Sequence, residues 1–387
     1  MAKIAVVHVP FFSHINAATR LSAVLVRQGH EVTAWAPEPC RRRIEAAGAG
    51  FRPHEPEMPQ VHGFEGWVAE LAAMTAECSQ PLIEELFAHD PDLVVHDSQV
   101  PWARVAAEYL GVPRIVSHPM FPIVSSHVIH SKAQLELPSP HPEESMKRFE
   151  DSWLSIAQRW GVELGDWGAV IHSAWASETT FAYTTEEVLG DFQLPPSWQF
   201  IGPMMDPPPP RAARGDRPFV YGCFGTSFNG RPELFRTVID GLADQPYDVL
   251  ISMGAGDILA TDLGPLPANV AVRDFVPARD MLARADAHIT HGGCNSTHEC
   301  LLAGVPMLLV PQAYDQFPLA GQIELLGAGK VAEEDPAAIR DGVRWLLEDE
   351  APGARARELG RHLAEFDGEG RVATAVEEVL AAGAAAV

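Results

Sequence analysis

The stretch that decides the fold runs from Asp274 to Gln316 and reads DFVPARDMLARADAHITHGGCNSTHECLLAGVPMLLVPQAYDQ. A β-prone run over 287–290 leads through His291 and two glycines into a helical pattern that continues to Leu302. The order of strand, glycine turn and helix directs free backbone N–H groups and the positive end of a helix dipole towards an anion. The stretch therefore predicts a phosphate site, although a glycine loop that merely caps a helix has the same pattern.

Polar residues stand just beyond a second strand pattern, which covers 305–310 and ends at Pro311. These residues are Gln312, Asp315 and Gln316. Open α/β sheets bind their ligands outside the carboxyl ends of the strands. We therefore expect a ligand here, and the acceptor and donor atoms of Asp315 and Gln316 suit the hydroxyl groups of a sugar.

Strand and helix patterns alternate along the rest of the chain. Continuous apolar, β-branched runs such as IAVVHV within 3–9 are typical of strands buried on both faces of a parallel sheet. Further strand patterns cover 31–36, 92–96, 114–117, 219–224, 248–253 and 270–275, and helix patterns cover 17–28, 41–47, 102–110, 145–160, 232–242, 281–285, 336–347, 355–366 and 370–382. This alternation predicts an α/β protein with doubly wound, mostly parallel sheets.

The length of the chain and a proline-rich segment predict two domains. A chain of 387 residues exceeds what one hydrophobic core usually organises. The run Pro207–Pro210 favours an extended polyproline spacer. We predict a first domain over 1–205, a linker over 206–217, a second domain over 218–366, and a helix in 367–387 that packs back on the first domain. Both domains are expected to be Rossmann-like and to face one another across a cleft.

Composition excludes several classes of protein. The formal net charge of −24 argues against a nucleic-acid binder, because phosphate neutralisation needs clustered Lys and Arg. No apolar run approaches the roughly 18 to 20 residues that a membrane span needs, and the first apolar run is typical of a strand rather than a signal peptide. The five scattered cysteines predict reduced thiols and no structural zinc, and we expect a cytoplasmic protein.

His14 and Asp97 are the candidate residues for proton transfer. His14 lies in a predicted turn over 10–16 after the first strand, and its imidazole can titrate near neutral pH, as a general base should. Asp97 follows another strand at the same sheet edge, where it could hold that imidazole through an N–H to carboxylate bond. Each residue has a structural alternative: a loop histidine is often a surface or packing residue, and Asp97 could cap the helix that begins near Pro101.

Side chains with donor and acceptor atoms surround the predicted phosphate site. Glu299 lies eight positions after His291 and can accept hydrogen bonds from ribose hydroxyls. Candidate donors to a phosphate are Thr226, Ser227, His291, Ser296 and Thr297.

Several of these motifs together resemble a known family. They are FFSHIN, YGCFGTS, FVP, THGGCNSTHE and GVPMLLVPQAYDQ, and they occur in order over nearly the whole chain. In this combination the chain resembles bacterial glycosyltransferases of the GT-B fold and family 1 type, in the macrolide and natural-product group related to plant UDP-sugar transferases. Each motif is weak alone, whereas the set is specific.

The resemblance implies an inverting, metal-independent transfer of a sugar or deoxysugar. The donor would be a UDP- or TDP-sugar, used as a co-substrate with no other cofactor, and the acceptor a hydroxyl of a hydrophobic, antibiotic-type natural product. His14 matches the general base of the family and Asp97 its partner. The matched donor residues are Thr226 in the glycine loop of the second domain, His291, Gly293, Asn295 and Ser296 at the pyrophosphate, Glu299 at the ribose, and Asp315 with Gln316 at the sugar.

The chain departs from the family pattern at the nucleotide base. Where the family often has Trp-x-Pro-Gln, this chain has Phe275, Val276, Pro277 and Ala278. We expect Phe275 and Val276 to contact the base, with stacking on the Phe275 ring and without the glutamine contact, so the choice between UDP and TDP stays open.

Aromatic and methionine side chains indicate where the acceptor binds. Phe12 lies beside His14, whereas Met120, Phe121 and Trp153 belong to a segment that interrupts the alternation of strands and helices. We expect these four residues to line a hydrophobic pocket, although packing in the core explains each of them equally well.

Other functions remain possible on the same fold. The chain could be a nucleotide-sugar epimerase, or a non-catalytic partner that activates another transferase, although intact His14, Asp97 and Asp315 argue against the latter. A nicotinamide-dependent oxidoreductase is disfavoured, because FFSHIN stands where a GxGxxG motif would follow the first strand. We expect a monomer or a homodimer.

Overall fold

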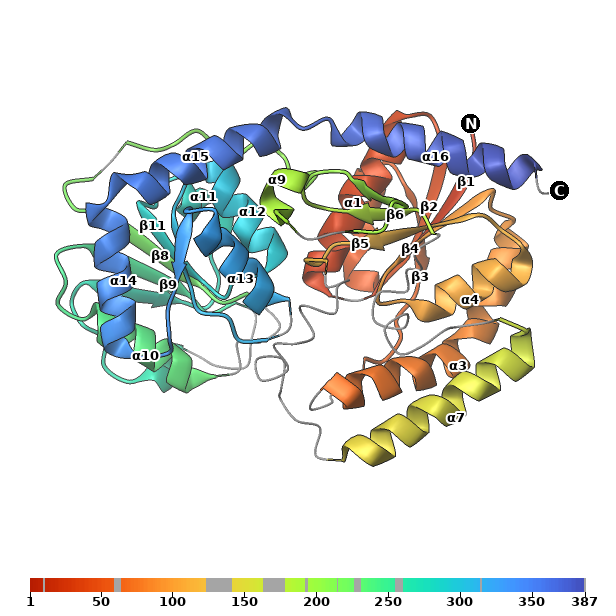
Figure 1. Ribbon diagram of the computed structural model, residues 1–387, viewed down its shortest axis with the longest axis horizontal. Helices are drawn as coiled ribbons and strands as arrows, with labels where there is room; N and C mark the ends of the chain where they lie inside the picture. The colour runs from red at the N-terminus through yellow and green to blue at the C-terminus, as the bar shows by residue number, and fades with distance from the viewer. Residues whose placement is uncertain are drawn as a thin grey trace. The chain divides into compact units, whose positions relative to one another are not determined.

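The computed structural model describes residues 1–9, 11–58, 64–122, 141–162, 178–191, 194–213, 215–225, 231–254, 260–313 and 315–385. It divides into two compact units. Unit 1 comprises Met1–Tyr183, Gln193–Met204 and Asp367–Val387, and unit 2 comprises Thr184–Phe192 and Met205–Phe366. Each unit contains a parallel sheet with helices packed against it, which confirms the predicted α/β class with two doubly wound sheets (Figure 1). The predicted cleft between the domains stays a prediction.

Unit 1 is built on a seven-stranded parallel sheet of order β3-β2-β1-β4-β5-β6-β7. Its strands are β1 (Lys3–Val7), β2 (Glu31–Ala36), β3 (Gly50–Pro53), β4 (Leu93–Asp97), β5 (Arg114–His118), β6 (Thr180–Ala182) and β7 (Trp198–Phe200). Its helices are α1 (Phe12–Arg27), η1 (Glu38–Cys40), α2 (Arg41–Ala46), α3 (Phe64–His89), α4 (Pro101–Leu110), α7 (Pro142–Trp160) and α16 (Gly368–Ala385).

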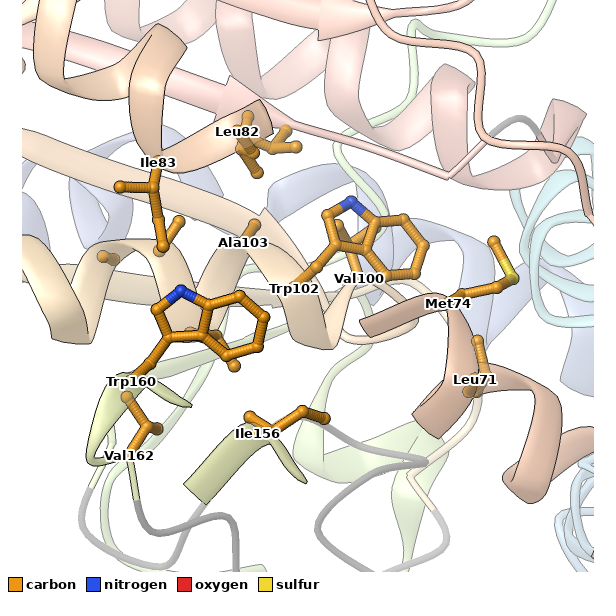
Figure 2. Close-up of a cluster of buried hydrophobic side chains, with 14 of the residues drawn as sticks. Leu71, Met74, Leu82, Ile83, Val100, Trp102, Ala103, Ile156, Trp160 and Val162 are labelled. Atoms are coloured by element: carbon orange, nitrogen blue, oxygen red, sulfur yellow. The ribbon is translucent and has the colours of Figure 1, made fainter. Parts of the chain in front are cut away.

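The alternation of side chains along these strands gives unit 1 two cores. Val6 and Val95, which are paired in the sheet, pack with residues of α1 and α16 on one face. Ala5 and Val94, the next pair, pack with α3, α4 and α7 on the other face. Figure 2 shows the second core, in which Trp102 of α4 lies among residues from α3 and α7. Both faces of the sheet are therefore buried, as the apolar strand patterns predict.

Two helices of unit 1 differ from the sequence-based prediction. α1 begins at Phe12, so His14 lies in its first turn and not in a loop. The predicted turn over 10–16 is wrong because Ile15 is 4% exposed, and burial of its side chain favours an early start of the helix. Helix α3 was not predicted; it has Pro81 inside it and is stabilised by packing against α4 and α7.

Unit 2 is built on a six-stranded parallel sheet of order β10-β9-β8-β11-β12-β13. Its strands are β8 (Phe219–Cys223), β9 (Asp248–Ser252), β10 (Val270–Arg273), β11 (Ala287–Thr290), β12 (Met307–Leu309) and β13 (Gly329–Val331). Its helices are α9 (Glu186–Leu189), α10 (Pro232–Leu242), η2 (Ala260–Leu263), α11 (Ala278–Leu282), α12 (Cys294–Ala303), α13 (Gln316–Leu325), α14 (Pro336–Glu348) and α15 (Glu350–Glu365).

The chain passes between the units more often than the sequence analysis indicated. Thr184–Phe192, which the prediction placed in the first domain, clusters with unit 2. Two contacts hold this segment there: the Thr184 hydroxyl lies 3.1 Å from Nε2 of His298 in α12, and Glu187 forms a 2.9 Å ion pair with Arg355 in α15. The C-terminal helix α16 belongs to unit 1, where Val376 is part of the buried core.

Helix α12 is fixed by a close approach of α15. A Cβ added at Gly360 of α15 would lie 2.0 Å from the backbone oxygen of Leu301 in α12, which is closer than any side chain tolerates. Glycine at this position therefore lets the two helix backbones meet.

We expect Gly360→Ala to lower the free energy of unfolding of unit 2 by about 1–3 kcal/mol, because the added methyl group pushes α15 away from α12. Gly321→Ala is the matched control, since Gly321 also lies within a helix, α13, but an added Cβ there meets nothing within 4 Å. The control should be neutral or stabilising by about 0.5–1 kcal/mol. Urea unfolding followed by circular dichroism compares the two, and equal effects would disprove the close-packing explanation.

Candidate active site

His14 and Asp97 form a direct, buried contact. Nδ1 of His14 lies 2.8 Å from Oδ2 of Asp97. His14 is 5% exposed and Asp97 is fully buried. Because an ionised carboxylate can only accept, Nδ1 of His14 is the donor. The neutral ring then carries its lone pair on Nε2, which is the arrangement that a general base requires.

The sheet explains why two residues so far apart in sequence meet. β1 and β4 are neighbouring parallel strands with Val7 paired to His96, so the residues after both strands emerge at one edge. α1 begins a few residues after β1 and brings His14 to this edge, where β4 ends in Asp97.

Asp97 does not cap α4, so that structural alternative is wrong. The residue at the cap position of α4 is Val100, and Pro101 occupies the first turn. Oδ1 of Asp97 instead accepts the backbone N–H of Gln99 at 2.8 Å. This second hydrogen bond fixes the plane of the carboxylate while Oδ2 faces His14.

Electrostatics keep Asp97 ionised. Burial, the largest influence, would raise the pKa of this carboxyl, but the charge and hydrogen bond of His14, and the smaller contributions of His8, together hold the pKa below its usual range. A lowered pKa means that the carboxylate persists throughout the neutral pH range. It is therefore available to orient His14 and to stabilise a positive charge on that ring.

The start of α12 in unit 2 leaves backbone donors for a ligand. Gly293 is at the cap position, and among the described residues no side chain caps this helix. The preceding turn is held by Thr290, whose Oγ1 accepts the N–H of Gly292 at 3.3 Å and lies 3.1 Å from the Ser296 hydroxyl. The uncapped first turn and the helix dipole suit an anion, as the sequence predicts.

The imidazole of His291 lies between two glycines. A Cβ added at Gly225 would come within 2.9 Å of Cε1 of this ring, and a Cβ at Gly293 within 2.4 Å of Nε2. Gly225 also has a φ of +78°, which side chains rarely adopt. The two glycines therefore create the slot that the His291 ring occupies.

Burial lowers the pKa of His291 to about 4, and a hydrogen bond with the backbone of Cys223 only partly opposes this. The ring is thus neutral at pH 7. It can offer an N–H to a phosphate oxygen, but it does not contribute a full positive charge.

Gln316 has a role that the sequence analysis missed. Its Oε1 accepts the backbone N–H groups of Gln312 at 2.9 Å and Ala313 at 3.2 Å. The side chain therefore shapes the loop after β12, and only its amide nitrogen remains to donate to a sugar hydroxyl. Asp315, directly before α13, is half-buried in the same loop.

The structure places the other donor candidates as follows. Asn295 and Glu299 are half-buried on α12, next to the uncapped turn. Phe275, after β10, is 64% exposed, which leaves its ring accessible for stacking, and Val276 is half-buried. Thr226 and Ser227 lie outside the described residues.

The structure describes the side chains of three of the four acceptor candidates. Phe12 is the first residue of α1, and its side chain lies outside the described part of the structure. Met120 is half-buried after β5, whereas Phe121 is fully buried and presents no surface to a ligand. Trp153 packs on Phe149 of the same helix, with ring centroids 5.0 Å apart, against the core in Figure 2. Their role in acceptor binding stays a prediction.

Comparison with known proteins identifies relatives of this chain. The sequence pattern of the family described as Erythromycin biosynthesis protein CIII-like, C-terminal domain, matches residues 236–378. Demethyllactenocin mycarosyltransferase of Streptomyces fradiae is 29% identical over 365 residues, which cover 85% of this chain and 75% of that protein. Oleandomycin glycosyltransferase of Streptomyces antibioticus is 26% identical over 407 residues, which cover 98% of this chain and 91% of that protein. The solved structure of the calicheamicin glycosyltransferase CalG4 is 26% identical, covers 98% of both chains and gives a TM-score of 0.74.

This chain is a glycosyltransferase of the GT-B fold. The likeness extends over both units of the glycosyltransferase and confirms the resemblance to the natural-product group. None of the helices in the described ranges is long and apolar enough to cross a membrane.

We expect Gly225→Ala to displace the His291 ring of this glycosyltransferase into a more hydrated position, so that its pKa rises from about 4 towards the ordinary 6.5. The NMR titration of the His291 ring, assigned with His291→Gln, measures this shift. Gly327→Ala is the control, because Gly327 has a nearly identical φ of +76° but an added Cβ there meets nothing within 4 Å. An unchanged titration in Gly225→Ala would show that the ring does not depend on this glycine.

Proposed function

We propose that the protein transfers a sugar or deoxysugar from a UDP- or TDP-sugar to a hydroxyl of a hydrophobic natural product, with inversion and without a metal ion. The observation that carries this proposal is the 2.8 Å contact between His14 and the buried Asp97. It supports the assignment of His14 as the general base, because the contact leaves Nε2 free of a proton in the neutral ring. Asp97 holds this tautomer and stabilises the imidazolium that forms.

The proposed reaction is a single in-line displacement. The acceptor oxygen attacks the anomeric carbon, the bond from this carbon to the β-phosphate oxygen breaks, and the proton of the acceptor passes to Nε2 of His14. The nucleoside diphosphate leaves with the bonding electron pair. One displacement inverts the configuration at the anomeric carbon.

The leaving group would be stabilised at the start of α12. The uncapped N–H groups after Gly293 and the dipole of this ten-residue helix are suited to phosphate oxygens. His291 would add a neutral donor, with Asn295 and Ser296 beside it, while Glu299 would accept from the ribose. Backbone dipoles and neutral donors thus replace the charge that a metal ion supplies in other transferases.

The proposed contacts with the sugar and the nucleotide base involve residues in the loops at the carboxyl edge of the unit 2 sheet. Asp315 would accept hydrogen bonds from sugar hydroxyls, and the amide nitrogen of Gln316 would donate to them. Phe275 would stack on the nucleotide base, with Val276 beside it. We further propose that the enzyme acts in the cytoplasm as a monomer or homodimer and needs no other cofactor.

His14→Ala should reduce kcat by about 10²–10⁴-fold, because the acceptor oxygen then lacks its base. Asp97→Asn should reduce it to a similar extent, since the amide can donate to Nδ1 and force the ring proton onto Nε2. Product formation from UDP- and TDP-sugars with hydrophobic hydroxyl compounds is measured by mass spectrometry, and calorimetry with UDP and TDP is expected to give unchanged affinities. Turnover near that of the wild type in His14→Ala would remove this residue from the mechanism.

Nucleotide binding with no transfer by the wild type would favour the non-catalytic partner, and isomerised donor sugar would favour an epimerase.

Transfer should continue after exhaustive treatment with EDTA, and added Mg²⁺ should change kcat by less than about twofold, because the first turn of α12 and His291 already provide donors to the diphosphate. Initial rates before and after chelation test this expectation. Loss of activity that Mg²⁺ restores would contradict the metal-free mechanism.

A further inference from the structure

A second histidine faces the carboxylate that His14 uses. His8, the residue directly after β1, is 1% exposed. Its Nδ1 lies 3.6 Å from Oδ2 of Asp97, the same oxygen that His14 contacts at 2.8 Å. A separation of 3.6 Å is too long for a hydrogen bond but short enough for a direct electrostatic interaction. Among the described residues, neither ring nitrogen of His8 has a hydrogen-bond partner.

Three other buried histidines each have a hydrogen-bonding contact at Nδ1, which His8 lacks. Nδ1 of His96, His288 and His298 lies 3.1, 2.9 and 2.7 Å, respectively, from a backbone carbonyl oxygen. A buried polar group without a hydrogen bond destabilises a fold by roughly 1–3 kcal/mol. An apolar residue at position 8 would avoid that cost. Packing alone therefore does not explain the imidazole of His8. Among the described residues, the charged group that forms a direct electrostatic contact with it is Asp97.

The groups around Asp97 define the electrostatic setting. His8 approaches from the end of β1, and His14 approaches from α1. Tyr183, which follows β6, is buried, and its hydroxyl lies 2.9 Å from the hydroxyl of Ser117, the residue paired with Asp97 in the sheet. The pKa of Tyr183 is raised mainly by burial and further by the charge of Asp97, while the hydrogen bond with Ser117 and the charge of Arg20 oppose the shift. The phenol is thus neutral, and Asp97 is the anion of this cluster.

We propose that His8 is a positioning residue for proton transfer: its neutral ring directs an N–H at Asp97 and limits how strongly this carboxylate stabilises a protonated His14. This inference rests on the proposed function, in which His14 is the base. In this role, His8 influences the fraction of enzyme molecules in which the base is unprotonated.

A general principle and one observation support this division of roles between the histidines. One carboxylate compensates one positive charge, so His8 and His14 cannot both be protonated beside Asp97 without mutual repulsion. Burial lowers the pKa of His8 and outweighs the opposing influence of Asp97, so His8 is the ring that stays neutral. An N–H on Nδ1 of His8 would direct the positive end of its dipole towards Oδ2, the oxygen that His14 also contacts. It would thereby weaken the attraction between this oxygen and a positive charge on His14.

The test compares two variants of nearly equal shape. His8→Asn retains an N–H at the distance of Nδ1 from the backbone, whereas His8→Leu has the same branching with no donor. In profiles of kcat/KM from about pH 5 to about pH 9, His8→Leu should move the acid limb up by about half a pH unit, and His8→Asn should keep it near that of the wild type. The plateau of kcat and the KM for the donor should change by less than about twofold in both variants.

Controls separate this role from a structural one. His8→Phe, with a ring of similar volume and no donor, should behave like His8→Leu, and it replaces that variant if leucine does not fold. His54 is a half-buried histidine at the same sheet edge, and its Nε2 accepts a hydrogen bond from Nε1 of Trp102 at 2.9 Å. His54→Leu and His54→Asn should leave the acid limb in place. Thermal unfolding of every variant reports changes in stability separately.

Distinct outcomes would overturn the two proposals. Three results would refute the role of His8. The acid limb could stay in place in His8→Leu and His8→Phe, it could shift equally in His8→Asn, or it could move to lower pH. If those results occur while His14→Ala is inactive, only the inference about His8 fails. If His14→Ala retains turnover, the assignment of the base itself fails, whatever the His8 variants show.

Discussion

The hydrogen-bond ladder between β1 and β4 is the constraint on which the candidate base depends. Both strands are buried, so their backbone N–H and C=O groups must pair with one another. The parallel register that joins Val7 to His96 determines that both strands end at one edge of the sheet. Asp97 and His8 emerge at this edge, and α1 follows within a few residues to supply His14. The contact between these residues is therefore a consequence of the sheet, although they lie in distant parts of the sequence.

The same kind of constraint determines the geometry at the start of α12, the candidate anion site in unit 2. β8 and β11 are paired with Cys223 opposite Thr290, so the glycine-bearing loops that follow them are neighbours. The close approach of these loops leaves room for the ring of His291 only because Gly225 and Gly293 lack side chains. Behind the site, Gly360 allows α15 to contact α12 at backbone distance. Glycines thus have two structural roles here: Gly225 and Gly293 leave space for the His291 ring, and Gly360 lets α15 pack closely on α12.

Burial has opposite effects on ionisation in the two units. In unit 2 it keeps His291 neutral, because no carboxylate among its principal influences opposes the loss of hydration. In unit 1, Asp97 is fully buried but stays ionised, because two imidazoles and the N–H of Gln99 surround its oxygens. The protein therefore has a neutral donor, His291, where an anion is expected to bind. It has a fixed anion, Asp97, beside the histidine that is expected to accept a proton. Both states follow from local partners rather than from depth alone.

Local patterns in the sequence were sufficient for much of the fold. The predicted bounds of β2, β11 and α10 agree with the structure, because these elements carry continuous apolar runs or helical periodicity between clear ends. The order of the motifs was sufficient for the glycosyltransferase class and for the strand, glycine turn and helix around His291. His14 and Asp97 were found as a pair because both follow strands that neighbour one another in doubly wound sheets.

Other features depend on contacts between distant residues, which local patterns do not record. The 26-residue helix α3, with Pro81 inside it, is stabilised by α4 and α7 rather than by its own propensities. The early start of α1, the attachment of Thr184 to α12 and the use of Gln316 Oε1 by its own loop are likewise set by packing. The sequence pattern predicts His8 only as part of a buried strand. The sequence by itself determined the alternation of elements and the chemistry at the strand ends, whereas only the tertiary structure, through sheet register and burial, decided which of those groups share one carboxylate and which are charged.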